Sequence, residues 1–494
     1  MSAWEDIGAR LAAGEASLLG LWGEPGRVHL AVLEPSPQPP PPSPQPPPAG
    51  GGGEQSPLPL REGVGGGEGS PPTIRHFAFD CPDGHYPSLA RVHSPALRLE
   101  RTLRDLYGLI PEGLPDPRPW IAHGPTPTAY EFLPVEGEGL HQTPVGPVHA
   151  GIIEPGHFRF TCDGETVVRL EQRLGYTHKG IEALLAGAEI AVAARIAARS
   201  CGDSTVAYSL AFARAVEEAT GAAPPPRAVW LRALAAELER LANHLGDIGG
   251  VCNDASFALM QAHCAMLRER VLRAANACFG HRLMMDFVVP GGVSRDLPEA
   301  APALLLDLVS QLRSGFPPLV RLYDGTASLQ DRTNGTGILS ADLARQFAAG
   351  GYVGRASGRD FDARRDLGYA PYDQLAFVVP VRAEGDVNAR VWVRIDEIAA
   401  SLGLIEQILD RVPDGPLAVA LPPRAGEGLA LVEGFRGDVL AWVRMDAGRV
   451  ARAHLRDPSW FQWPLLEAAA KGNIVADFPL CNKSFNCAYS GTDL

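Results

Sequence analysis

Apolar residues in the second half of the chain recur at helical spacing. Between residues 231 and 248 they stand three or four apart, in a stripe made of Leu231, Leu234, Leu238, Leu241, Leu245 and Ile248. Such a stripe is typical of a long helix packed along one face. The pattern is helical throughout 180–279, and Ala- and Leu-rich segments predict further helices at 299–323, 340–349 and about 394–411.

A second pattern, the alternation of apolar and polar residues, predicts strands. The segment HFRFTCDGETVVRLEQRLG alternates on both sides of Asp163-Gly164, which is typical of a β-hairpin. Strands are also predicted at 375–381, 439–445 and 450–455. The expected fold class is therefore α+β, with a large, predominantly helical domain that contains small β-sheets.

Composition divides the chain into parts. Residues 35–73 are dominated by Pro, Gly and Ser, so they cannot bury enough apolar surface to fold and are expected to be disordered or locally polyproline II. A tolerated insertion is favoured over a docking motif for SH3-type domains. Because both flanks are apolar, we place the insertion in a loop of one small α/β domain, 1–122. A second Pro-rich stretch, 123–143, is predicted to link it to a large domain, 144–494.

Charge and hydropathy exclude several classes of function. Hydrophobic residues make up 46% of the 494 residues, which is typical of a globular protein with a large core. The net charge of −13 gives no electrostatic support for binding nucleic acid. No apolar run is long enough to span a membrane, and the acidic N-terminus does not match a secretory signal. We expect a cytoplasmic chain, which would be attached to a membrane only through other subunits.

The eight cysteines contain no CxxC pair, so a zinc or iron–sulfur site built by this chain alone is not expected. Cys264 and Cys278 lie in a helical, Leu-rich segment and are predicted to be core residues. No disulfide scaffold is expected in so large a cytosolic chain. The Gly-rich stretch GEGLALVEGFRG has no GxGxxG between a strand and a helix, so nothing in the sequence directly supports NAD binding.

Collinear motifs carry a family resemblance. In order they are GPVHAGIIEPGHFRF, RLGYTHKGIEALLAG, RSCGDSTVAYSLAFARAVE, GHRLMMDFVVPGGVSRDL and RDPSWFQWPLLEAAAKGNIVADFPLCNKSF. This series resembles the large subunit of formate-hydrogenlyase-type (group 4, energy-converting) [NiFe]-hydrogenases, which shares its ancestry with the quinone-site large subunit of complex I. Upstream, YPSLARVHSPALRLERTLRDLYGLIPEGLPDPRPW resembles the small partner subunit of complex I, fused in front. The resemblance implies the hydrogenase/complex I large-subunit fold.

The resemblance also allows a test of the metal site. In this family two CxxC pairs supply four thiolates to nickel and iron, because soft sulfur ligands are required. The first pair reads CGDS, so Cys201 is kept and Ser204 replaces the second cysteine; a serine hydroxyl is a poor bridging ligand. At the C-terminus, Ala488 and Gly491 stand where the other two cysteines are expected. We therefore expect no nickel–iron centre in this chain.

Two further observations favour that expectation. Cys487 lies one residue before the expected ligand, yet two thiolates do not build a bridged metal pair. The sequence also ends at Leu494, directly after the motif, whereas nickel-loaded members are usually made with an extension that is removed after metal insertion.

A quinone site matches the sequence less well. His149 of GPVH matches a family histidine, but the second histidine of the complex I motif has no counterpart at Glu154-Pro155-Gly156-His157. The complex I tyrosine that reaches the quinone falls on Gly202, and a later histidine falls on Tyr208. A hydrogenase cavity without its metals is favoured, and a quinone stays an alternative occupant.

The resemblance singles out residues that are candidates for proton transfer. Glu154 matches a glutamate that acts as a proton gate in hydrogenases, and a buried carboxylate with a raised pKa passes protons near neutral pH. The alternative is a salt bridge from Glu154 to Arg199 or Arg355. His178 and Glu182 stand four apart and are expected on one helical face, either as a proton path or as packing residues.

Other polar residues are assigned to the cavity or to ion pairs. Arg199, Arg355 and Ser357 are expected to line the cavity, and Asp386 and Arg390 to form a structural pair. A separate spacing of three and four predicts an internal network of ion pairs, with a solvated helix face as the alternative; its members are Glu237, Arg240 and His244.

These expectations define the functional hypothesis. The chain would be a subunit of a membrane-associated, energy-converting oxidoreductase complex related to hydrogenlyase hydrogenases and NADH-quinone oxidoreductase, in which electron transfer drives ion translocation. Its partners would be an iron–sulfur small subunit, a ferredoxin-like subunit and complex I-like membrane subunits, with the iron–sulfur clusters held by partners and no cofactor assigned to this chain. A catalytically silent scaffold and an atypical [NiFe]-hydrogenase are the alternatives, and catalysis by the chain itself stays open.

Overall fold

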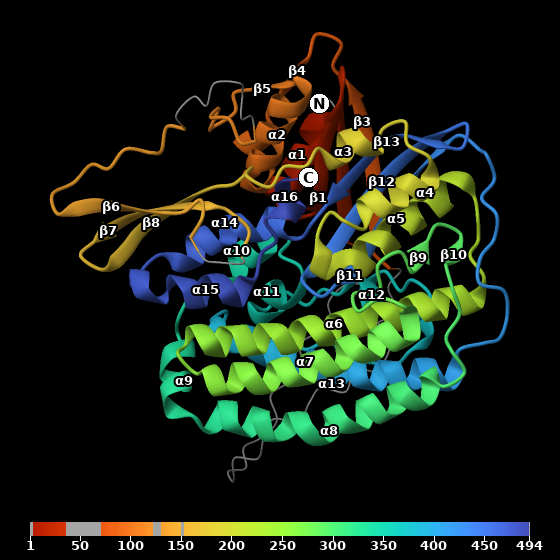
Figure 1. The fold of residues 1–494 in the computed structure, drawn as a ribbon. Helices are drawn as coiled ribbons and strands as arrows, with labels where there is room; N and C mark the ends of the chain where they lie inside the picture. The colour runs from red at the N-terminus through yellow and green to blue at the C-terminus, as the bar shows by residue number, and fades with distance from the viewer. Residues whose placement is uncertain (1–2, 36–70, 122–129, 150–152, 494) are drawn as a thin grey trace, which may run out of the picture.

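The computed structural model describes residues 3–35, 71–121, 130–149 and 153–493 (Figure 1). Most of the predicted insertion, residues 36–70, lies outside the described residues. The N-terminal part contains α1 (Ala3–Ala12), β1 (Ser17–Glu24), β2 (Arg27–Glu34), β3 (Thr73–Asp80), β4 (His85–Pro87), α2 (Leu97–Tyr107) and β5 (Ile110–Glu112). Strands β1, β2 and β3 form an antiparallel sheet in that order, and β4 pairs with β5 in parallel. Because Glu34 pairs with Thr73, the two ends of the insertion leave from adjacent strand ends.

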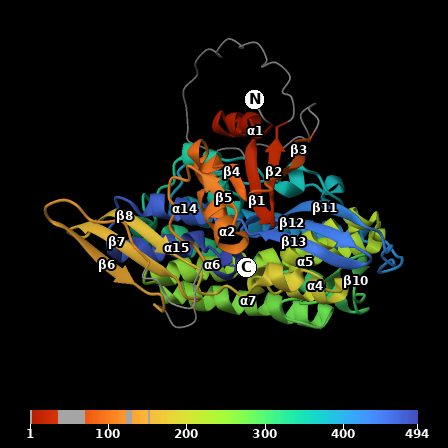
Figure 2. The same cartoon turned by 90° about the horizontal axis from the view of Figure 1, so that it is seen from above.

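A second sheet lies at one side of the molecule and consists of β6 (Leu140–Val145), β7 (His157–Asp163) and β8 (Thr166–Arg173) (Figures 1 and 2). The predicted hairpin is confirmed: β7 and β8 are antiparallel around Asp163-Gly164, and Gly164 has φ +56°. Strand β6 begins inside the segment predicted as a linker, because Leu140 already pairs with Asp163. Helices α14 (Ser459–Ala470) and α15 (Phe478–Phe485) lie beside this sheet.

Four long helices form the base of the molecule in Figure 1. They are α6 (Pro226–Asp254), α7 (Ala258–Phe279), α8 (Ala301–Gly325) and α13 (Val387–Arg411). The apolar stripe predicted between 231 and 248 lies in α6 and is fully buried, and Cys264 and Cys278 are core residues of α7, as predicted. The shorter helices are α3 (Ile181–Leu185), α4 (Ile190–Ala197), α5 (Thr205–Thr220), α9 (Ala327–Thr333), α10 (Ala341–Gln346), α11 (Gly351–Ala356), α12 (Ala363–Asp366) and α16 (Ser490–Asp493).

The third sheet packs between the N-terminal sheet and the helices (Figure 2). It consists of antiparallel β11 (Gly426–Gly434), β12 (Gly437–Asp446) and β13 (Arg449–Arg456), and a short ribbon pairs β9 (Val288–Val289) with β10 (Gly292–Val293). The strands predicted at 439–445 and 450–455 are confirmed. The one predicted at 375–381 is wrong, because both backbone groups of Ala376 bond to the side chain of Gln407 and no strand pairs with them.

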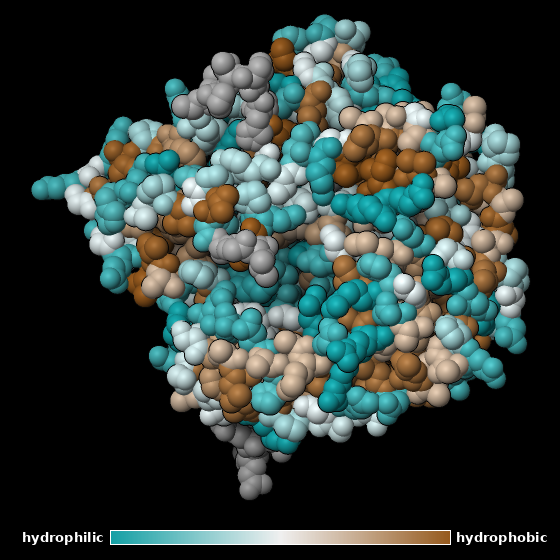
Figure 3. Space-filling model, viewed as in Figure 1, coloured by the Kyte–Doolittle hydropathy of each residue, from teal (hydrophilic) through white to brown (hydrophobic). Residues whose placement is uncertain are grey.

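The predicted α+β class is confirmed. All eight cysteines are unpaired and buried. Figure 3 shows an apolar patch over α3 and α4, where Leu184 and Val192 are exposed. Among the described residues, no helix combines the length and the apolar character needed to cross a bilayer.

Candidate functional site at the former metal-ligand positions

The fold brings together the two segments in which relatives with a nickel–iron centre are expected to have their metal ligands. Cys201 and Ser204 stand at the start of α5, and Ala488 and Gly491 lie in the C-terminal segment, almost 300 residues away. Tyr208 of α5 connects the two segments, because its hydroxyl lies 2.9 Å from the point where a Cβ on Gly491 would stand.

An ion pair occupies the space beside Cys201 and Ser204. Arg436 stands in the tight turn between β11 and β12, and its Nη2 and Nη1 lie 2.5 Å and 2.8 Å from the two carboxylate oxygens of Asp203. Nη1 also donates to Ser204 Oγ at 3.2 Å and to Cys201 Sγ at 3.6 Å. Burial raises the pKa of the Asp203 carboxyl, but Arg436 outweighs it and holds that pKa at about 2. The pair is therefore charged at neutral pH.

The remaining cysteines are poor metal ligands in this setting. The Cys201 thiol donates to Asp203 Oδ1 at 2.8 Å, and burial raises its pKa well above the ordinary value. Burial likewise raises the pKa of the Cys487 thiol. Cys201 is instead hydrogen-bonded to Asp203 and lies beside the Arg436 guanidinium, a cation that would repel a metal ion.

The space beside Ala488 and Gly491 is closed by protein atoms. A Cβ at Gly491 would stand 2.6 Å from Asp457 Oδ2, so a cysteine does not fit there while Asp457 accepts the Tyr208 hydroxyl at 2.8 Å. The backbone of Ala488 is fixed by the Ser459 hydroxyl at 2.9 Å and by the Trp463 indole at 3.1 Å. Within the described ranges, no group of three or more His, Cys, Asp and Glu side chains has the arrangement of a metal site. These residues do not fit a nickel–iron centre.

Glu154 and His149 flank the C-terminal motif. Glu154 is exposed rather than buried, and its carboxylate accepts from the backbone amide of Ser490 at 3.0 Å. The alternative salt bridge is wrong, because Arg199 pairs with Asp286 at the surface and Arg355 pairs with other acids. His149 packs 6.4 Å from the Tyr489 ring, and its buried Nε2 has no hydrogen-bond partner among the described residues.

His178 and Glu182 do not share a helical face. Helix α3 begins only at Ile181, because Gly180 has φ +69° and interrupts the chain before it. His178 is exposed and contacts the carbonyl of Asp493. Glu182 is buried elsewhere, at the junction with the N-terminal domain. The prediction of a common face is therefore wrong.

Arg355 belongs to a buried network of ion pairs. It lies 2.5 Å from Glu397 and 2.9 Å from Glu433, whereas Arg199 lies on the surface and does not join it. Ser357 is buried near it in the chain, and its hydroxyl has no hydrogen-bond partner among the described residues. The structure thus separates Arg199 from the other two residues that were predicted to line the cavity.

The predicted network on α6 is confirmed and joins the Arg355 network. His244 Nε2 lies 2.6 Å from Glu397, and Arg240 lies 3.5 Å from both Glu397 and Glu237. All four side chains are buried, so the alternative of a solvated face is wrong.

The pair expected between Asp386 and Arg390 does not form. Asp386 caps α13 by accepting from Ala389 N at 2.7 Å. Arg390 instead donates to the Gly337 carbonyl at 2.8 Å and to Ser484 Oγ at 2.9 Å. Each group is satisfied by a different partner, which is why the ion pair is absent.

Arg436 and Asp457 were not predicted as site residues. Both lie in segments with visible signals: Arg436 stands in FRG between two strand-forming stretches, and Asp457 in the family motif RDPSW. The local sequence does not distinguish a turn arginine with a buried partner from a solvated one, because the partner depends on the tertiary fold.

Comparison with known proteins shows which family this chain resembles. Residues 254–425 match the family described as respiratory-chain NADH dehydrogenase, 49 Kd subunit. Formate hydrogenlyase subunit 5 of Escherichia coli is 33% identical over 85% of this chain and 79% of its own length. A subunit of the NADH-quinone oxidoreductase of Clostridium beijerinckii is 31% identical over 67% of this chain and 91% of its own. A chain in the structure of the membrane-bound sulfane sulfur reductase, an archaeal respiratory membrane complex, matches with a TM-score of 0.69 and 29% identity, over 73% of this chain and all of that one.

The fold and these matches define a class: the large subunits of multi-subunit oxidoreductase complexes. Within that class, the chain belongs to the family that unites group 4 hydrogenase large subunits with the 49 Kd-type subunit of NADH-quinone oxidoreductase.

Proposed function

We propose that this chain is the large subunit of a membrane-associated, energy-converting oxidoreductase complex and that it holds no nickel–iron centre. Family membership supports the first part, since its relatives are named as subunits of hydrogenlyase, NADH-quinone oxidoreductase and respiratory membrane complexes. The single observation that carries the second part is the Arg436–Asp203 ion pair beside Cys201, in the place of the thiolate ligands.

The chain's own residues then have a defined task in such a complex. Arg436 and Asp203 form a compact, charge-balanced pair at the position where the family resemblance implies metals in hydrogenases. Asp457 and Tyr208 close the opposite side of this position. Electrons would travel on iron–sulfur clusters of a small subunit and a ferredoxin-like subunit, and ions would move through complex I-like membrane subunits. The exposed apolar patch over α3 and α4 is of the kind that partner subunits cover. Attachment at the cytoplasmic face of the membrane belongs to this proposal.

Elemental analysis tests the central claim. The chain is purified with its co-expressed small subunit, and each subunit is also purified alone; nickel and iron are then measured per chain. We expect iron only in samples that contain the small subunit, and nickel in none. Nickel near one per chain would overturn the proposal and restore the hypothesis of an atypical hydrogenase.

A second measurement separates an electron-transferring subunit from a silent scaffold. The purified complex is reduced with dithionite, and reoxidation of its iron–sulfur clusters by a soluble quinone is followed optically. We expect reoxidation that slows when Glu154→Gln and His149→Ala are introduced together. If the unmodified complex and the double variant were reoxidised at the same rate, this chain would be assigned a scaffold role.

A further inference from the structure

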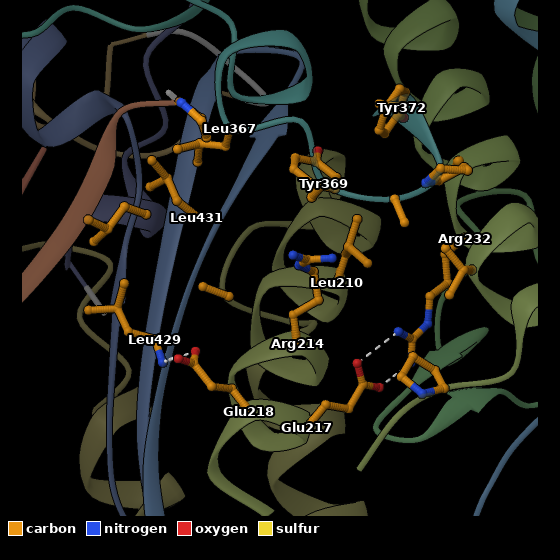
Figure 4. A pocket seen from close by; sticks show the side chains of 18 of the residues that line it. Leu210, Arg214, Glu217, Glu218, Arg232, Leu367, Tyr369, Tyr372, Leu429 and Leu431 are labelled. Atoms are coloured by element: carbon orange, nitrogen blue, oxygen red, sulfur yellow. Dashed lines mark hydrogen bonds and ion pairs between the residues drawn. The ribbon is translucent and has the colours of Figure 1, made fainter. Parts of the chain in front are cut away.

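A cavity of about 690 Å³ lies away from the former metal-ligand positions (Figure 4). Its walls come from α5, the first turns of α6, strand β11, the start of β3 and the loop 367–372. Leu210 and Arg214 of α5 line it, whereas Tyr208 points from the opposite side of the same helix towards Asp457. The cavity is therefore separate from the site described above, and its size is that of a small-molecule pocket.

Most of the lining is apolar or aromatic. In Figure 4, Leu429 and Leu431 lie on one side, Tyr372 lies towards the other, and Tyr369 and Leu210 lie near the middle. Such a surface favours an apolar or aromatic ligand body over a strongly hydrated one.

Arg214 supplies a cation inside these walls, and no salt bridge of the described residues pairs it. Its guanidinium carbon lies 4.7 Å from the centre of the Tyr369 ring, and Figure 4 shows the side chain extending into the middle of the cavity. Its Nε is buried without a hydrogen-bond partner, and within the described part of the chain the Arg214 side chain donates no hydrogen bond and forms no salt bridge. Arg214 is half-buried, and its side-chain N–H groups have no protein partner among the described residues, so they are available to a ligand.

The nearby acids are already engaged. Glu217 lies 2.5 Å from Arg232 and also accepts from the Gly291 amide at 2.8 Å. Glu218 accepts from the Leu429 amide at 2.8 Å. Neither carboxylate forms an ion pair with Arg214, although both stand within about one helical turn of it.

We propose that this cavity binds a monocarboxylate with an apolar, planar body. The carboxylate would accept two parallel hydrogen bonds from the Arg214 guanidinium, a geometry that suits a planar fork better than a point charge. The body would pack among the leucine and tyrosine side chains. The ligand should carry no more than one negative charge, because Arg232 already pairs with Glu217, and the Glu218 carboxylate, which accepts from a neutral amide, stands close to Arg214.

The test uses the full chain with 2-naphthoate as the probe and 2-naphthamide as its uncharged isostere. Fluorescence titration and calorimetry should show binding of naphthoate at least tenfold tighter than of naphthamide. Arg214→Gln should weaken naphthoate binding at least tenfold and change naphthamide binding less than twofold. Arg321→Gln, on exposed Arg321 of α8, is the matched control and should change neither.

A second variant keeps the test decisive if Arg214→Gln folds poorly. Ala222 lines the cavity and is only half-buried, so Ala222→Trp should fill part of the space and abolish binding of naphthoate. Equal affinity for the acid and the amide would overturn the proposal. So would naphthoate binding that survives both Arg214→Gln and Ala222→Trp.

Discussion

The guanidinium of Arg436 has four kinds of acceptor: the Asp203 carboxylate, the Ser204 hydroxyl, the Cys201 sulfur and the Asn486 carbonyl. These contacts connect the turn after β11, the start of α5 and the C-terminal segment. A charge that holds three segments in this way is costly to leave unpaired, which makes Asp203 the residue on which the interior of the site depends.

Removal of the Asp203 carboxylate should therefore destabilise the fold. We expect Asp203→Ala to cost about 2–3 kcal/mol in urea unfolding, below the roughly 3–5 kcal/mol of a fully buried pair, because Asp203 keeps 35% of its side-chain surface exposed while Arg436 keeps 5%. Asp286→Ala, which breaks an exposed pair with Arg199, is the control and should cost less than about 1 kcal/mol. Equal costs for the two variants would contradict this account, as would failure of Asp203→Ala/Arg436→Met to regain stability.

Glu239 lies in the same region, and its pKa is shifted upwards, whereas that of Asp203 is shifted downwards. The two carboxyl groups therefore affect stability in opposite directions as the pH changes. Its buried carboxyl accepts from the amides of Val206 and Ala207, and burial raises its pKa from 4.5 to about 8. A raised pKa in the folded state means that its contribution is complete below pH 4.5 and is lost as the pH rises through 8. Glu239→Gln, which has no proton to lose, should therefore show a flatter decline of stability between about pH 5 and 8 than the unmodified protein.

Thermal unfolding in a pH series measures this difference. The surface variant Glu269→Gln should keep the slope of the unmodified protein, because Glu269 takes part only in exposed ion pairs with Arg273 and Arg282. Parallel curves for the unmodified protein and Glu239→Gln would show that Glu239 does not titrate in this range.

At the scale of single residues, the sequence predicted the position of the site but not the residues that interact there. Motif spacing identified Cys201, Ser204, Ala488 and Gly491, and the fold brings these positions together. It did not identify Arg436, because the partner of a turn arginine is decided by the crossing of β11 and α5. It also assigned Glu154 to the interior, where the C-terminal segment instead leaves it at the surface.

At the scale of elements, helix α6 was predicted from its sequence pattern and strand β11 was not. Long apolar stripes such as that of α6 contain their own helical period, so they are predicted well. The segment GEGLALVEG of β11 reads as Gly-rich, although its glycines are needed because α5 crosses it closely: a Cβ at Gly428 would stand 2.1 Å from the Ala215 carbonyl oxygen. The close approach of two elements is a tertiary property, and the local pattern does not reveal it.

Substitution of Gly428 tests that packing. Gly428→Ala should destabilise the protein by about 1–3 kcal/mol, because the helix and the strand have to move apart. Gly403→Ala in α13 is the matched control: its Cβ meets nothing within 4 Å, so the substitution should be neutral or stabilise by up to about 1 kcal/mol. The urea midpoint should fall for Gly428→Ala and should stay the same or rise for Gly403→Ala. Similar shifts of the two midpoints would contradict the close packing of α5 on β11.

At the scale of the whole molecule, the N-terminal sheet is joined to the large domain by buried polar and aromatic contacts. The Trp22 ring of β1 stacks on His454 of β13 at 4.8 Å, and Arg444 of β12 lies 2.6 Å from Glu24. Arg452 reaches back to the carbonyl of Gly23 at 2.9 Å. An N-terminal part that shares buried charges with the rest of the chain is expected to unfold together with it rather than separately.

Glu182 is the acid on which this junction depends, and it makes the junction sensitive to low pH. Its carboxylate lies 2.7 Å from Arg452, 2.5 Å from His454 and 2.7 Å from the Tyr107 hydroxyl. Burial raises the pKa of Glu182, but Arg452 and His454 outweigh burial and lower it from 4.5 to about 2. Because the folded-state pKa is depressed, the stabilisation is present above pH 4.5 and is lost as the pH falls through 2, and it amounts to about 3 kcal/mol.

Glu182→Gln should remove most of that stabilisation at neutral pH and flatten the fall in stability between pH 4.5 and about 2. Acid unfolding followed by circular dichroism, together with Trp fluorescence from the junction, measures both effects. Glu189→Gln, at an exposed ion pair with Arg449, is the matched control and should leave the acid transition in place. If Glu182→Gln left the transition unchanged, the junction would be held by its aromatic contacts instead; if only the Trp signal moved, the two domains would unfold separately.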